Sequence, residues 1–144
     1  MSKIATDFEQ SKHLAKILPI ESADMMWTYD FTVNDINGLN IISDNLKLEE
    51  DDLPAWSLSA LLKVLPAHIT KGNKVYNLST EKYESIVCDK NNDELYKIAW
   101  SYDVRYVNKQ YRLSLYATKS HDDPIDSCVE MIKLLKNKKL LKTC

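Results

Sequence analysis

The chain of 144 residues has the length of one ordinary domain, and its 44% hydrophobic and 28% charged residues are typical of a globular protein rather than a disordered one. Its formal net charge of −2 provides no overall field that would attract nucleic acid or an anionic membrane. The two glycines, Gly38 and Gly72, are too few for phosphate-binding loops or dinucleotide-binding turns, which excludes those classes of nucleotide enzyme.

The first part of the sequence predicts a helix followed by a strand. Thr6 and Glu9 have the spacing of a capping box, and apolar residues then recur at helical spacing until a proline ends the pattern. We therefore expect the first helix over residues 6–18. A short helical turn at 22–26 and a strand over 27–33, rich in aromatic and β-branched residues, are expected to follow.

The stretch LPAWSLSALLKVLP, residues 53–66, predicts a second helix. Residues 34–52 before it are rich in Asn, Asp and Gly and indicate a long or mobile loop. Ser57 or Ser59 is the expected N-cap, and leucines at helical spacing form a buried stripe. Trp56 is expected to pack at the entry of this helix, and it is also a candidate interaction residue.

After residue 66 the apolar period changes from 3.6 to 2, which predicts strands. Two short strands flank the Lys-Gly-Asn turn at residues 71–73, and the segments YESIVCD and LYKIAWSYD form a hairpin. Trp100 and Tyr102 share one face of the second hairpin strand. The segment YRLSLYAT adds a further strand, so these adjacent strands predict an antiparallel meander.

The last element, DDPIDSCVEMIKLLKNKKLL, is the clearest helix in the sequence. Asp122 or Asp123 is the expected N-cap and Pro124 the first helical residue. The apolar stripe of this helix comprises Ile125, Cys128, Val129, Ile132 and Leu135. We expect an α+β fold with N- and C-terminal helices, in which helices pack on one face of the antiparallel sheet, in a single domain over residues 1–144.

The cysteines and the N-terminal segment predict a compartment. Cys88, Cys128 and Cys144 lie far apart and are odd in number, which argues against a disulfide framework. The N-terminal segment has no apolar core of signal-peptide length, and no later window approaches a membrane span. We therefore expect a cytoplasmic protein that has no membrane partner.

Three phrases occur in a distinctive order: EQSKHLAKILPIESADMMW, LPAWSLSALLKVLP and DPIDSCVEMIKLLKNKKL. This order resembles a family of small proteins from gut Bacteroidales genomes and from their prophages and other mobile elements. Those proteins have an early SADM-like phrase, a central LPAWSL-like phrase and a late helix entered by an acidic or proline-bearing turn. The resemblance implies a prophage or mobile-element origin, and it implies no reaction and no site residue.

The cluster His121 to Asp123 is the one local group with metal-ligand or acid–base chemistry. It defines one alternative, a small hydrolase or metal enzyme around His121. The competing interpretation is that the aspartates cap the last helix. No GxSxG or HExxH motif occurs, and Cys128 lies on an apolar stripe, so we expect a protein that is not an enzyme and needs no cofactor.

Lysines crowd the last helix and the tail, and they define a second alternative, a nucleic-acid-binding accessory factor. Lys136, Lys138 and Lys139 are its candidate contact residues. The competing interpretation is that lysines at a helix C-terminus complement the helix dipole and remain solvated. Since the net charge is negative, this alternative is not favoured.

The favoured hypothesis is a non-enzymatic accessory protein of a prophage or mobile element that acts as a protein-interaction module. It depends on the family resemblance and on the lack of a catalytic motif. Its candidate interaction residues are Trp56, Trp100 and Tyr102, together with Lys136, Lys138 and Lys139. The protein partner is not identified by the sequence, and pairing of sheet edges would also give a homodimer.

Overall fold

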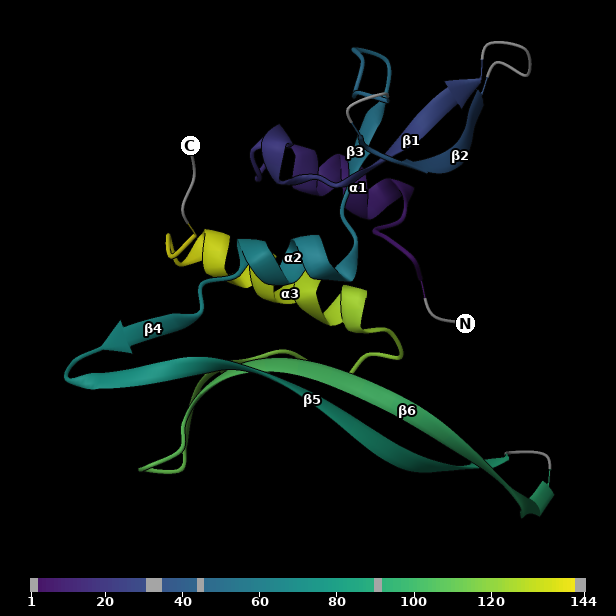
Figure 1. Ribbon diagram of the computed structural model, residues 1–144. Coiled ribbons are helices and arrows are strands. Elements are labelled where there is room, and N and C mark those ends of the chain that lie inside the picture. Colours follow the sequence, from purple (N-terminus) through teal and green to yellow (C-terminus); the bar gives the residue numbers. More distant parts are fainter. Residues whose placement is uncertain (1–2, 31–34, 44–45, 90–91, 142–144) are drawn as a thin grey trace. The chain divides into compact units, whose positions relative to one another are not determined.

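Figure 1 shows the computed structural model, which describes residues 3–30, 35–43, 46–89 and 92–141. The first of its two compact units contains residues 3–65 and the end of the chain from Ile132, and the second contains residues 66–131. The expected single domain over residues 1–144 stays a prediction. Within the described residues the α-helices and two antiparallel sheets confirm the α+β fold class.

The first unit contains a three-stranded antiparallel sheet with the order β2-β1-β3, formed by β1 (Met25–Asp30), β2 (Asp35–Ile41) and β3 (Leu53–Ala55). The expectation of a loop over residues 34–52 is wrong where β2 lies. The sequence DINGLNI has weak strand propensity because of its Asp, Asn and Gly residues, but pairing with β1 satisfies its backbone groups.

Helix α1 (Phe8–Ala15) begins one residue after its N-cap, Asp7. The capping box consists of Asp7 and Gln10, so the prediction of Thr6 and Glu9 is wrong. The Thr6 side chain is instead engaged with Ser11, since their hydroxyl oxygens are 2.7 Å apart. The expected helical turn at 22–26 lies earlier, as the 3₁₀ turn η1 (Ile20–Ser22).

Helix α2 (Leu58–Val64) confirms the helix predicted in the LPAWSLSALLKVLP stretch. Of the two serines considered, Ser57 is the N-cap, and its hydroxyl accepts a hydrogen bond from the backbone N–H of Ala60 at 3.2 Å. Leu61 and Leu65 are buried, as the helical spacing of the leucines predicts.

The second unit contains a four-stranded antiparallel sheet whose order follows the chain, β4-β5-β6-β7. Its strands are β4 (His68–Lys71), β5 (Lys74–Asp89), β6 (Asn92–Asn108) and β7 (Leu113–Ala117). This confirms the meander and the turn around Gly72, where a φ of 65° favours glycine. The central hairpin strands are longer than expected, because β5 continues the strand after that turn without a break.

Helix α3 (Pro124–Asn137) has the predicted apolar stripe, and all five residues of that stripe are buried. A side-chain oxygen of Asp123 accepts a hydrogen bond from the backbone N–H of Ile125 at 2.9 Å, which confirms an aspartate at the helix start. The Ser127 hydroxyl donates to the Tyr102 carbonyl at 2.7 Å, so the first turns of α3 lie against β6. No helix in the described part of the chain has the length and apolar character needed to cross a membrane.

Candidate functional site

The SADM phrase (residues 22–25) and the LPAWSL phrase (residues 53–58) meet in the first unit, where β1 and β3 pair. The Asp24 carboxylate accepts hydrogen bonds from both the backbone N–H, at 2.8 Å, and the hydroxyl of Ser57. Ser57 in turn caps α2. These hydrogen bonds between Asp24 and Ser57 connect the two phrases in one structural joint, which fixes the start of α2.

Trp56 lies at the centre of this joint and is fully buried. Its indole N–H donates to the Ser22 hydroxyl at 2.9 Å, and its backbone N–H donates to the Thr6 hydroxyl at 3.1 Å. The Thr6 backbone N–H donates back to the Trp56 carbonyl at 2.9 Å. Burial and satisfied polar atoms agree with the expected packing role of Trp56, and its side chain presents no exposed surface to a partner.

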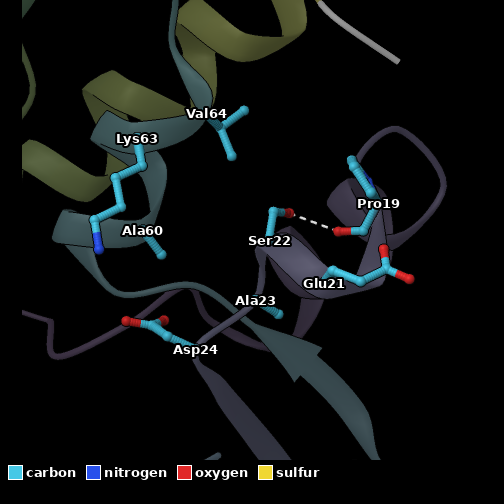
Figure 2. Close-up of a pocket in the computed structure, with 8 residues that line it drawn as sticks. All are labelled: Pro19, Glu21, Ser22, Ala23, Asp24, Ala60, Lys63 and Val64. Carbon is cyan, nitrogen blue, oxygen red and sulfur yellow. Dashed lines mark hydrogen bonds between the residues drawn. The ribbon is translucent and has the colours of Figure 1, made fainter. Parts of the chain in front are cut away.

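A cavity of about 440 Å³ opens beside the joint, between η1 and α2 (Figure 2). Apolar and polar residues contribute equally to its lining, which comprises Pro19, Glu21, Ser22, Ala23, Asp24, Ala60, Lys63 and Val64. The hydroxyl of Ser22 is engaged with the Pro19 carbonyl at 2.6 Å, and the carboxylate of Asp24 is engaged with the start of α2. The Ser22 hydroxyl and the Asp24 carboxylate are therefore already engaged in hydrogen bonds that stabilise the fold.

His121, the centre of the enzyme alternative, is half-buried and forms a pair with Glu130, with 3.3 Å between Nε2 and Oε1. The other carboxylate oxygen of Glu130 accepts a hydrogen bond from the Lys119 backbone N–H at 2.8 Å. The pair thus ties the segment before α3 to the helix itself. Among the described residues, no group of three or more His, Cys, Asp or Glu side chains is placed to hold a metal ion.

The candidate lysines Lys136, Lys138 and Lys139 are all exposed at the end of α3. The helix ends in a Schellman motif, in which the backbone N–H of Leu140 donates to the Leu135 carbonyl at 2.9 Å and that of Lys139 donates to the Lys136 carbonyl at 3.1 Å. Lys139 occupies the left-handed position, with a φ of 58°. The Schellman motif accounts for the left-handed conformation of Lys139, so no bound ligand is needed to explain it.

The β5–β6 hairpin brings the candidate residues Trp100 and Tyr102 onto one face, together with Lys82 from β5. Lys82 lies directly opposite Tyr102, and its Nζ is 4.2 Å from the Trp100 ring centroid and 5.7 Å from that of Tyr102. Farther along the same face, Val104 and Tyr106 are buried, whereas Trp100 is 47% exposed. This face therefore changes from core to exposed aromatic surface.

The opposite face of the hairpin carries a polar network. The Arg105 guanidinium binds the Asp103 carboxylate and donates to the Tyr83 hydroxyl at 2.9 Å, and this hydroxyl donates to Asp103 at 3.3 Å. The hydrogen bond to Asp103 raises the pKa of Arg105, and loss of solvent together with the charge of Asp103 raises that of Tyr83. Side chains from both strands are thereby held together.

Much of the hairpin is a two-stranded ribbon (Figure 1). The paired positions of β4 lie along β5 only at residues 74–77, and those of β7 lie along β6 only at residues 105–108. No strand among the described residues pairs with the outer edge of β5 over residues 79–89. Exposed backbone N–H and C=O groups on such an edge are a template for pairing with another chain.

Sequence reasoning found the shared face of Trp100 and Tyr102 but missed Lys82 and the open edge. Lys82 carried no signal because cross-strand register is needed to place it over the rings. Comparison of the chain with protein-family models, curated proteins and solved structures returns no match. The candidate site on the hairpin is therefore argued from the geometry of this chain alone.

Proposed function

We propose that the protein is a non-enzymatic accessory protein, of prophage or mobile-element origin, that binds another polypeptide through the β5–β6 hairpin. The observation that carries this proposal is the open outer edge of β5 beside exposed aromatic side chains. A two-stranded ribbon is marginally stable in water by itself, and pairing with a further strand satisfies its free backbone groups. Strand addition is a common mode of peptide recognition.

The exposed aromatic residues strengthen this interpretation. Trp100 is 47% exposed and Tyr83 is 38% exposed, on opposite faces of the hairpin. Rigid aromatic side chains bury a large area at low entropic cost, and they are enriched at the centres of protein interfaces. A strand added to the edge would thus have an aromatic contact available on either face.

Site-specific photo-crosslinking in the cells that encode the protein tests this function. A photoreactive residue at Thr80, which lies on the open part of β5, should form covalent adducts with protein. The same residue at the exposed position Glu9 of α1 is the matched control and should form few. A hairpin that yields no protein adduct above the level of the Glu9 control would overturn the proposed function.

The exposed lysines at the end of α3 support a second candidate function, binding of nucleic acid. If Lys136, Lys138 and Lys139 bind phosphates, the affinity for duplex DNA falls steeply with salt. Changing all three to Ala should lower the slope of log K against log salt by about one for each phosphate that is no longer neutralised. Equal slopes for the parent and the triple variant would remove this candidate.

A further inference from the structure

The geometry points to a second copy of this chain as the polypeptide that pairs with β5. We infer that two β5 strands join antiparallel around a twofold axis at Tyr83, so that Lys82 of each copy faces Glu84 of the other. This inference rests on the proposed function of the hairpin. It adds the identity of the partner and the register of the pairing.

The direction of the backbone groups limits the allowed registers. The Leu78 backbone N–H donates to the Ala67 carbonyl, on the side of β5 where β4 lies. Because backbone groups alternate along a strand, the N–H and C=O groups of Thr80, Lys82 and Glu84 also point to that outer edge. Antiparallel self-pairing must therefore match even-numbered residues with even-numbered residues.

Charge distinguishes the registers with an axis at residue 82, 83 or 84. An axis at Lys82 would place two lysines opposite each other, and an axis at Glu84 would do the same for two glutamates. An axis at Tyr83 places Lys82 opposite Glu84 twice, in positions that exchange backbone hydrogen bonds. Opposite charges across strands stabilise a pair and like charges destabilise it, so the Tyr83 axis is favoured.

This register fits the free length of the edge. Around Tyr83 it extends over residues 79–87 of both copies, and it stops where β4 begins to pair with β5 at residue 77. Lys82, Glu84 and Trp100 share one face of the hairpin. With a twofold axis perpendicular to the sheet, the exposed Trp100 rings of both copies lie on the same side of the joined sheet.

A charge-exchange experiment tests the inference on the full chain, with sedimentation equilibrium as the readout. In a dimer of the Lys82→Glu variant, two glutamates lie opposite each other at each 82–84 pair. In a dimer of the Glu84→Lys variant, two lysines lie opposite each other there. Each single variant should weaken self-association at least about tenfold. An equimolar mixture of the two variants should associate with at least parental affinity, because every 82–84 pair then has opposite charges.

Lys109→Glu is the matched control, because it makes the same charge change at an exposed turn residue of the same unit and should leave association unchanged. A parent chain that stays monomeric at 100 µM would overturn the inference. So would a mixture of Lys82→Glu and Glu84→Lys that fails to recover association, or a Lys82→Glu variant that associates more tightly because Lys82 blocks the edge.

The photo-crosslinking at Thr80 separates the two claims. Adducts only with other proteins, together with a monomeric parent, would leave the proposed function standing and reject the second copy as partner. Adducts whose mass is that of two chains support both claims. No protein adduct above the control level removes the proposed function itself.

Discussion

At the scale of single residues, individual side chains affect stability through one hydrogen bond or through the conformation of one backbone position. The clearest is the Asp24 carboxylate, which receives two hydrogen bonds from Ser57 and thereby fixes the N-cap of α2. The sequence pattern narrowed this cap to Ser57 or Ser59, because a cap is a local feature. It did not identify Asp24, since this residue precedes Ser57 by 33 positions in the chain.

Lys139 is the residue whose replacement should stabilise the protein. Its φ of 58° is left-handed, where a Cβ is unfavourable and glycine is preferred. We expect Lys139→Gly to raise the free energy of unfolding by about 1 kcal/mol, measured by urea denaturation. Lys138→Gly is the control and should lower it, since Lys138 is not among the described residues with positive φ. Equal effects of both changes would contradict this explanation.

Cys128 should make the protein less stable at alkaline pH. Burial, with a smaller contribution from Asp123, raises the pKa of its thiol to about 12 from an ordinary value of 9.0. Above pH 9 the unfolded chain releases a proton that the folded chain retains, so the free energy of unfolding falls as the pH rises toward 12.

Urea denaturation at pH 8 and pH 10 measures this effect. Between these values we expect Cys128 to account for a loss of about 1 kcal/mol, which Cys128→Ala should remove. Burial also raises the pKa of the Tyr106 hydroxyl, so part of the alkaline destabilisation remains in the variant. A parent chain and a Cys128→Ala variant with the same pH dependence would show that the thiol ionises equally in both states.

At the scale of elements, the long hairpin is the feature that local patterns described least well. Two strands and a turn were visible in the alternation of residues, but the continuous β5 was not. The same limit explains β2, where Asp, Asn and Gly among residues 35–41 lower the strand propensity and pairing with β1 satisfies the backbone groups. Strand pairing joins segments that are distant in the sequence, so a single-sequence pattern records it weakly.

Proline substitutions distinguish the two edges of β5. Thr80→Pro removes an N–H that points to the open edge, so it should abolish self-association while changing the thermal midpoint Tm little at a protein concentration where the parent chain is monomeric. Glu81→Pro removes an N–H that points toward β6 and with it a hydrogen bond of the β5–β6 ladder, so it should lower the thermal midpoint Tm clearly more than Thr80→Pro does. Circular dichroism and sedimentation measure the two effects. Equal destabilisation by both prolines would show that the outer edge is not free.

At the scale of the whole molecule, self-association couples stability to concentration. If folded copies pair and unfolded chains do not, mass action raises Tm as the protein concentration rises. For a dimer of this size we expect roughly 2 °C for each tenfold increase. Lys82→Glu should reduce this dependence, because it weakens the pairing. A parent Tm that is constant from 1 to 100 µM would contradict pairing in the folded state.

The sequence by itself determined the α+β class, the apolar stripe of α3, and two candidate residues for the cap of each of α2 and α3, between which the structure selects Ser57 and Asp123. These features follow from local spacing and local hydrogen bonds, so neighbouring residues carry the information. Only the tertiary structure decided that the SADM and LPAWSL phrases form one joint, that Trp56 is buried, and that Lys82 lies over Trp100. Each depends on contacts between segments distant in sequence, and in the hairpin the register of the strands determines which side chains meet and which edge stays open.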